Sequence, residues 1–328
     1  MRKTHIISRI FRLSSCLVLI PLLLIVFEKG YAQSATDANE QSFSRHVSAN
    51  SEVGYFTFLG GVGNIESLWF EGLLAPSYSL RIHEDAKWGV VLVPKIVFRM
   101  YRQDSQPVNA PSYMPQISFY YQMNEPTNNF NNLLYVFGRF VHHSNGQDDE
   151  FYNVDGTLNT ISGDFSTNYF EIGAFLTKLL VPRLNATEFY RTSLEFHPDF
   201  LQYDPLEGLY GNLRWHNDIQ LFKITTRSLR SIFTGEDDRQ SYKTRSKHPK
   251  MRARINTTLI FGEMKDISAF NISRRLCVSA TLSYHPDMLR DVRIFTQYYY
   301  GQDYYNMQFQ NTINVLRFGL MVDPFNTD

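Results

Sequence analysis

Three polar residues near the middle of the 328-residue sequence are suited to nucleophilic hydrolysis: His142, Ser144 and Asn168. His142 and Ser144 are two positions apart, so on a β-strand their side chains point to one face, roughly 6.5–7 Å apart. A histidine beside a serine can act as the base that activates the hydroxyl as a nucleophile. An amide such as Asn168 can orient the imidazole and select its tautomer. A His-x-Ser pair alone arises often by chance, so the hypothesis depends on whether Asn168 lies near it.

Two alternating segments would bring these residues together. Residues 133–144 and 167–177 both alternate with period two, which predicts two β-strands joined by a polar loop. Asn168 is on the apolar face of its strand, as His142 is on that of the first strand. If the strands pair directly as a hairpin, Asn168 lies opposite His142. His143 points to the other face and is predicted to be a bystander.

The rest of the sequence predicts the fold to which this hairpin belongs. Aromatic residues are abundant, with 26 Phe, 20 Tyr and 3 Trp, yet the mean hydropathy is −0.28. After the first 32 residues no segment reaches the roughly 18 consecutive apolar residues of a membrane helix. Alternating strands with one apolar face suit a twelve-stranded antiparallel transmembrane β-barrel of the bacterial outer membrane, an all-β fold. The expected strands are 54–60, 68–80, 88–102, 115–124, 133–144, 167–177, 188–198, 208–221, 251–262, 273–285, 292–300 and 316–323.

The N-terminus predicts export. A basic start, an apolar core at 16–27 and small residues before Gln33 indicate a signal peptide over 1–32. A polar N-terminal arm over 33–50 and a β-barrel domain over 51–328 would follow. A soluble β-sandwich would alternate similarly, but the signal peptide and the aromatic content favour the membrane. The formal net charge is zero, so no nucleic acid is expected as a partner.

The region around Ser144 resembles a known family. The string His142-His143-Ser144-Asn145-Gly146, followed by Ser166-Thr167-Asn168, is similar to the signature of the outer-membrane phospholipase A barrels. Weaker matches extend the resemblance over most of the chain from about residue 90. They are Ser105-Gln106-Pro107, Tyr113, Pro115-Gln116, the segment 292–301, Phe309, Thr312, Gly319, Met321 and Phe325.

This resemblance implies a function and the role of each residue. It implies an enzyme that hydrolyses the acyl esters of membrane phospholipids, namely a phospholipase of A1/A2 type that also has lysophospholipase activity. By position, Ser144 would be the nucleophile, His142 the general base and Asn168 the group that holds His142. The backbone N–H of Asn145 or Gly146 would help to bind the oxyanion.

The resemblance also implies a calcium ion and a homodimer. The matching calcium ligands are the carbonyls of Ser105 and Gln147 and the carboxylate of Asp149, oxygen groups that suit a hard cation. The sequence departs from the family here. Gln147 replaces an Arg, Tyr152 stands where a Ser ligand would be, and the loop is longer. Beside Asn168, Thr167 and Tyr169 replace a Trp and an Arg.

Two further interpretations stay open. The chain could be a non-catalytic outer-membrane barrel, a channel or a structural protein, that retains the motif; the altered calcium loop favours this alternative, whereas the intact triad favours the enzyme. The basic stretch 222–250 is either a patch for anionic lipid or a solvated turn insertion, and the second interpretation is preferred.

Overall fold

The computed structural model describes most of the predicted barrel domain. The described residues are 47, 49–64, 67–81, 86–102, 108–124, 133–178, 187–224, 251–286, 288–289 and 291–322. Within them, no helix is long and apolar enough to cross a membrane. The expected signal peptide, most of the expected arm and most of the basic stretch 222–250 lie outside the described residues.

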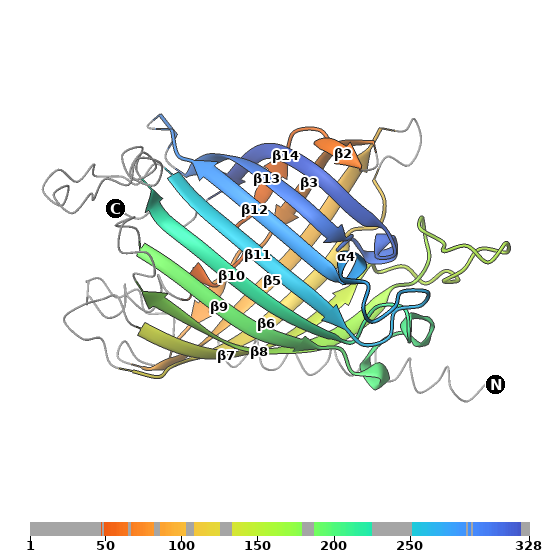
Figure 1. The fold of residues 1–328 in the computed structure, drawn as a ribbon, viewed down its shortest axis with the longest axis horizontal. Helices are drawn as coiled ribbons and strands as arrows, with labels where there is room; N and C mark the ends of the chain where they lie inside the picture. Colours follow the sequence, from red (N-terminus) through yellow and green to blue (C-terminus); the bar gives the residue numbers. More distant parts are fainter. Residues whose placement is uncertain are drawn as a thin grey trace, which may run out of the picture. The chain divides into compact units, whose positions relative to one another are not determined.

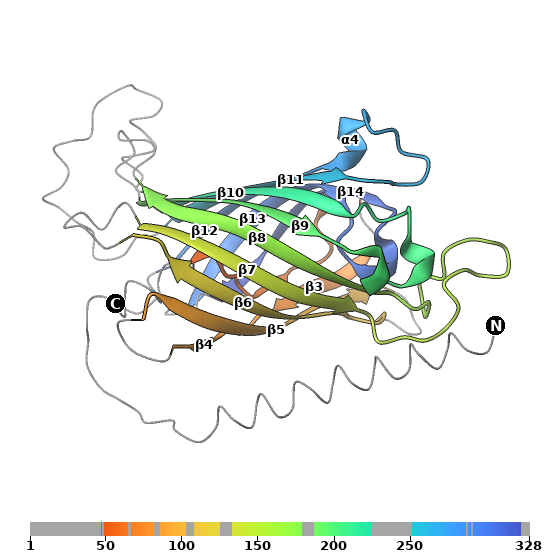
Figure 2. The ribbon, with the colours of Figure 1, turned by 90° about the horizontal axis from the view of Figure 1, so that it is seen from below.

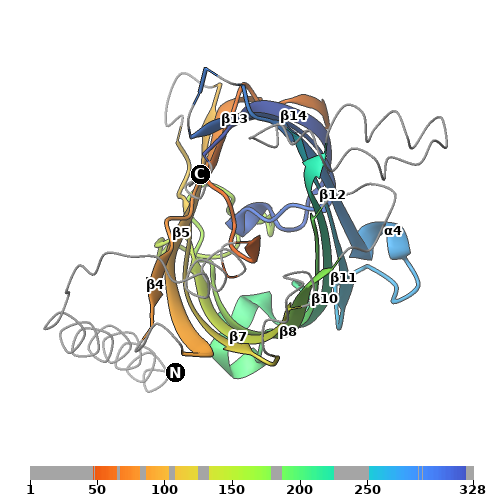
Figure 3. The ribbon, with the colours of Figure 1, turned by 90° about the vertical axis from the view of Figure 1, so that its left-hand side faces the viewer.

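The described strands form one closed antiparallel sheet (Figure 3). Ten uninterrupted strands, β5 to β14, follow one another around the barrel, and each pairs with the next in the chain. Two further positions in the barrel, here called staves, are each made of two short strands in succession. β1 and β2 form one and both pair with β14, while β3 and β4 form the other and both pair with β5. The described residues therefore make a barrel of twelve staves, as the sequence predicts. The strands are β1 (Tyr55–Thr57), β2 (Val62–Asn64), β3 (Leu68–Leu74), β4 (Tyr78–Leu80), β5 (Trp88–Tyr101), β6 (Ser112–Gln122), β7 (Leu133–Ser144), β8 (Ser166–Lys178), β9 (Thr187–Phe196), β10 (Leu213–Ile224), β11 (Met251–Phe261), β12 (Leu276–Tyr284), β13 (Val292–Gln302) and β14 (Thr312–Val322).

Side chains alternate between an apolar outer face and a charged lumen. On β14, Leu316 and Phe318 are exposed outward, whereas Arg317 is buried inside. Inside the lumen, Arg99 donates to its cross-strand neighbour Glu71 and to Asp303, each at 2.7 Å. Charged groups can be buried when they are paired in this way. An apolar exterior, a polar interior and closure without a free edge are what a bilayer demands of a spanning sheet.

Three connections gather at one end of the barrel, where β7 finishes. The loop 145–165 after β7 lies at this end with the 3₁₀ turns η1 (Asp199–Leu201) and η2 (Asp204–Leu206), which follow β9 (Figures 1 and 2). The segment between β13 and β14, with η4 (Asn306–Gln308), joins them. They share an apolar cluster that anchors this end of the barrel; its buried members are Phe151, Phe165, Leu206, Leu209, Tyr210, Met307 and Phe309.

Candidate active site

The hairpin of β7 and β8 brings His142 and Asn168 into contact. Every residue of β7 pairs in unbroken register with β8, so that His142 lies opposite Asn168 and Ser144 opposite Ser166. His142 Nδ1 is 2.9 Å from Asn168 Oδ1. Both residues are on the outer face and half-buried. The cross-strand contact expected from the alternation is thus present.

The Asn168 amide is held by a second contact. Its Nδ2 donates to the carbonyl of Leu201 in η1 at 2.7 Å. With the amide nitrogen engaged there, the oxygen faces His142, so the Nδ1–H of His142 is the donor and Nε2 remains an acceptor. The 197–203 segment is itself fastened to β8, since Tyr203 N–H donates to Ser166 O at 2.8 Å. The sequence did not identify Leu201, because its contact uses a backbone carbonyl, which every residue type has.

Ser144 ends β7 on the same outer face as His142. It is half-buried and stands in register between Tyr113 of β6 and Ser166 of β8. Phe140 and Phe170, one step nearer the middle of their strands, are also outward, with ring centroids 5.2 Å apart. The serine hydroxyl and the imidazole therefore open onto the apolar exterior.

The two backbone N–H groups suggested for the oxyanion differ in the structure. The Asn145 N–H donates to Phe165 O at 3.1 Å and extends the β7–β8 ladder by one residue. Within the described residues, no acceptor engages the N–H of Gly146. Gly146 has a φ of 69°, a left-handed conformation that glycine adopts at little cost. Of the two groups, only the Gly146 N–H is free to meet a developing negative charge.

The Asn145 side chain organises the loop that follows. Its Nδ2 donates to Gly163 O at 2.7 Å, and its Oδ1 accepts from the N–H groups of Gln147 and Phe165. Asparagine often makes such local bonds to the backbone at turns. The side chain of Asn145, not considered in the sequence analysis, thus ties both ends of the 145–165 loop together beside Ser144.

On the lumen side, other groups support the same strands. His143 is buried, and its ring lies 4.7 Å from that of Phe165. Thr167, adjacent to Asn168, shares a 2.9 Å hydrogen bond with His197 Nδ1, and His197 Nε2 is 2.7 Å from Glu195. Burial lowers the pKa of His197 although the Glu195 carboxylate acts in the opposite direction. His143 faces away from Ser144, as expected.

The predicted calcium ligands fit a calcium site only in part. Ser105 lies outside the described residues. Gln147 is half-buried and Asp149 is exposed, and the Asp149 carbonyl already accepts the N–H of Asp164 at 3.0 Å. The described residues contain no group of three or more His, Cys, Asp or Glu side chains arranged for a metal ion. Ca²⁺ takes six to eight oxygen ligands, so the Asp149 carboxylate and the Gln147 carbonyl would supply a minority of them.

Solved structures share this fold. The chain is similar to outer membrane phospholipase A from Escherichia coli, with a TM-score of 0.52 and 12% identity over 84% of this chain and 98% of that one. An active-site mutant of the E. coli protein gives a TM-score of 0.51 at 12% identity, over 83% and 90% of the two chains. The calcium-bound dimer of the Salmonella typhi outer membrane phospholipase gives 0.50 at 12% identity, over 88% and 86%.

Sequence comparison adds nothing to this likeness. No protein-family model matches the chain, and no curated protein sequence matches it. At 12% identity the structural likeness establishes the fold, a twelve-stranded antiparallel barrel. The resemblance noted in the sequence is thus confirmed as a likeness of fold to outer membrane phospholipase A, and the predicted outer-membrane location agrees with these neighbours.

Proposed function

We propose that the protein is an outer-membrane phospholipase that hydrolyses the acyl esters of membrane phospholipids with Ser144, His142 and Asn168. The observation that carries this proposal is the 2.9 Å contact between His142 and Asn168 on the outer face, beside Ser144. Polar side chains on the lipid-facing side of a barrel are costly and are retained for function by default. An ester at the membrane interface can reach this face without entering the lumen.

The arrangement supports a double-displacement reaction. Ser144 Oγ attacks the ester carbonyl carbon while His142 Nε2 takes its proton, and Asn168 steadies the imidazolium through Nδ1–H. The Gly146 N–H would stabilise the oxyanion. His142 then returns the proton to the leaving lysophospholipid alcohol. Water hydrolyses the acyl-serine in a second step that uses the same base.

Calcium dependence and dimerisation are finer parts of this proposal. If calcium binds, Gln147 and Asp149 would hold it beside the Ser144 end of the loop, where it would offset the charge of the oxyanion. The calcium-bound dimer among the similar structures supports both features. The alternative of a wide channel is disfavoured, because buried, paired charged side chains occupy the described lumen: Arg99 pairs with Asp303 of the segment after β13, and Arg139 pairs with Glu171 of the neighbouring strand β8.

Fatty-acid release tests the proposal. Refolded protein would be mixed with phospholipid micelles, with calcium or with a chelator. The proposal predicts release of fatty acid and lysophospholipid with calcium, and much less with chelator. No release at any calcium concentration from a correctly folded barrel would favour the non-catalytic alternative.

A further inference from the structure

The part of the chain that precedes β1 lies inside the barrel. In the view along the barrel, the start of the described chain runs within the ring of strands (Figure 3). Val47 is 2% exposed and belongs to a buried apolar cluster, in which β7 takes part with the first half of its length. The described end of the predicted polar arm is therefore part of the barrel interior, in the half away from Ser144. The aromatic members of the cluster come from β6 to β9 and are Tyr120, Tyr135, Phe137, Phe175 and Phe189.

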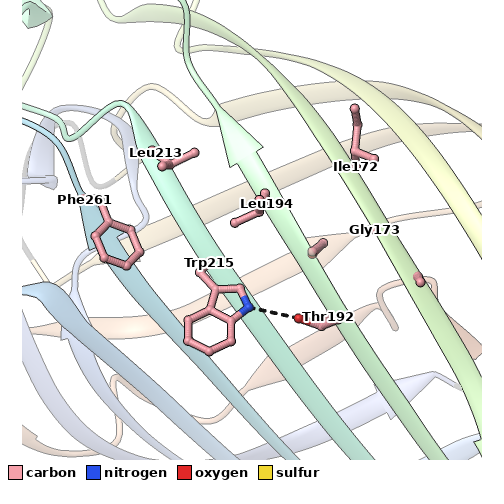
Figure 4. A pocket seen from close by; sticks show the side chains of 9 residues that line it. Ile172, Gly173, Thr192, Leu194, Leu213, Trp215 and Phe261 are labelled. Carbon is pink, nitrogen blue, oxygen red and sulfur yellow. Dashed lines mark hydrogen bonds between the residues drawn. The ribbon is translucent and has the colours of Figure 1, made fainter.

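Asn50 is held by two strands of the wall. Its Nδ2 donates to the Tyr120 hydroxyl on β6 at 3.0 Å, and Arg191 Nη1 on β9 donates to its Oδ1 at 3.3 Å. Arg191 points inward, whereas its neighbour Thr192 points outward and accepts the Trp215 indole N–H at 2.9 Å on the exterior (Figure 4). Asn50 is 1% exposed, so both ends of its amide are satisfied by the lumen wall.

Two more strands hold the residues on either side of Asn50. Gln220 Nε2 on β10 donates to Ala49 O at 2.9 Å. Lys95 Nζ on β5 donates to Glu52 Oε1 at 2.8 Å. Together with the apolar cluster, these contacts tie the segment to six consecutive strands, β5 to β10.

Glu52 also lines a polar cavity of about 260 Å³ in the lumen. Cys277 lines the same cavity from the start of β12, at the Ser144 end of the barrel. The connections that share the apolar cluster of Phe151 and Phe309 gather over that end. Toward the opposite end, the segment before β1 lies between the cavity and the mouth of the barrel.

A barrel of this width needs an inserted segment to be filled. About eight strands leave an interior that side chains alone can fill, whereas about sixteen to eighteen strands leave an aqueous channel. The twelve staves of this barrel lie between these limits. Its lumen is nevertheless filled in the half away from Ser144, because Ser283 on β12 and Arg293 on β13 are buried there as well.

We propose that Val47 and residues 49–52 are a plug, which closes the lumen at the end opposite Ser144 and keeps water-soluble molecules out of the polar cavity. The burial of Val47 and the hydrogen bonds to β5, β6, β9 and β10 make the plug part of the folded barrel. Without it, the lumen would admit solutes that the membrane otherwise holds back. The proposal goes beyond ester hydrolysis and does not depend on it.

The thiol of Cys277 reports whether the cavity is closed. Cys277 is the one cysteine of the chain after the expected signal peptide, since Cys16 lies within that peptide. The probe is a cationic, membrane-impermeant methanethiosulfonate, added to the refolded barrel in detergent, and the labelled fraction is followed by mass spectrometry. Val154→Cys in a Cys277→Ser background gives the rate of an exposed thiol. Wild-type Cys277 should react more slowly, and equal rates would show an open cavity and overturn the plug.

Displacing the plug should expose Cys277. A triple variant with Val47→Asp, Asn50→Ala and Glu52→Lys places a charge in the apolar cluster and removes both hydrogen bonds of the Asn50 amide. It also replaces the ion pair with Lys95 by a repulsion. The labelling rate of Cys277 should rise at least about tenfold, which corresponds to about 1.4 kcal/mol, less than the burial of one valine side chain contributes. Heat-modifiable migration on gels checks that the variant is folded.

A matched control changes the same three residue types on the surface. Glu150→Lys, Asn153→Ala and Val154→Asp lie in the exposed part of the 145–165 loop and should leave the labelling rate of Cys277 unchanged. An equal rise in this control, or no rise in the folded plug variant, would overturn the proposal.

A smaller substitution locates the segment even if the triple variant does not fold. Ala49→Cys in the Cys277→Ser background adds one sulfur atom beside the apolar cluster. Its thiol should be labelled more slowly than that of Val154→Cys. Equal labelling rates of these two thiols in folded barrels would place the segment outside the lumen and overturn the plug.

Discussion

His142 and Asn168 face each other in register on β7 and β8, and His142 Nδ1 lies 2.9 Å from Asn168 Oδ1 on the outer face of the barrel. Because the Asn168 Nδ2 is bound to the Leu201 carbonyl, the amide presents only its oxygen to the imidazole. The pair thereby fixes the histidine tautomer that a serine nucleophile needs.

Asn168 should act by orienting the His142 imidazole, and two substitutions probe its contacts with His142 and Leu201 separately. Asn168→Ala removes one hydrogen bond to His142 and should lower kcat by roughly 10–100-fold, equivalent to about 1–3 kcal/mol. Asn168→Asp keeps an oxygen for His142, but it sets its other carboxylate oxygen against the Leu201 carbonyl and so loses the hydrogen bond to Leu201. We expect Asn168→Asp to release fatty acid only slightly faster than Asn168→Ala. Full activity of Asn168→Asp would show that the Leu201 contact does not position the amide.

The two neighbouring histidines should behave differently. His142→Ala removes the base and should reduce turnover nearly to the level of a serine variant, because groups acting as one unit are not additive. His143→Phe keeps a ring against Phe165 on the lumen side and should retain near-wild-type turnover. Esterase assays on both variants in parallel check this, and a large loss in the folded His143→Phe protein would contradict the assigned faces.

Much of this arrangement could be predicted from the sequence. Period-two alternation identifies the apolar and polar faces of β7 and β8. A one-residue shift in their register would move every side chain of one strand to the wrong face. The pairing of His142 with Asn168 is consistent with this restriction on the register. Most expected strand boundaries agree to within three residues. The larger differences are β10, which begins at Leu213 and not at residue 208, since η2 and the turn after it occupy that stretch, and β14, which begins at Thr312 and not at residue 316. The expected strands 54–60 and 68–80 are interrupted, so that the first stave consists of β1 and β2 and the second of β3 and β4.

Other parts could not be predicted, for physical reasons. Leu201 contributes a carbonyl through a 3₁₀ turn that reaches Asn168 from 33 positions away, and any residue type has that carbonyl. The pairing of Asn145 N–H with Phe165 O depends on the ladder continuing one step past Ser144. Arg99 could be assigned to the lumen, but its partner Asp303 belongs to a distant loop.

Substitutions of Gly146 should affect activity through the backbone conformation that they disfavour and not through the size of the new side chain. A Cβ there would meet only the Tyr113 ring at 3.6 Å, an ordinary contact, but its φ of 69° disfavours alanine by about 1–2 kcal/mol. Asparagine tolerates this region better. We therefore expect kcat to decrease in the order Gly, Asn, Ala. Equal activity of Gly146→Ala and wild type would exclude the Gly146 N–H as an oxyanion donor held by this turn.

Calcium dependence should respond to Asp149. Asp149→Ala removes the exposed carboxylate that matches the family's site and should raise the calcium concentration needed for half-maximal activity. Asp155→Ala is the matched control in the same loop. Its carboxylate accepts hydrogen bonds from the Thr157 hydroxyl and N–H, which lower the pKa of Asp155. Calcium titrations of both variants decide this, and identical curves for Asp149→Ala and wild type would remove Asp149 from the site.

Fatty-acid release by Ser144→Ala beside wild type tests whether Ser144 attacks the ester from the outer face. Both proteins would be refolded, verified as barrels by heat-modifiable migration, and assayed on phospholipid micelles with saturating calcium. Wild type should release fatty acid, and release by Ser144→Ala should fall to background without loss of folding. Undiminished release by Ser144→Ala would show that Ser144 is not the nucleophile.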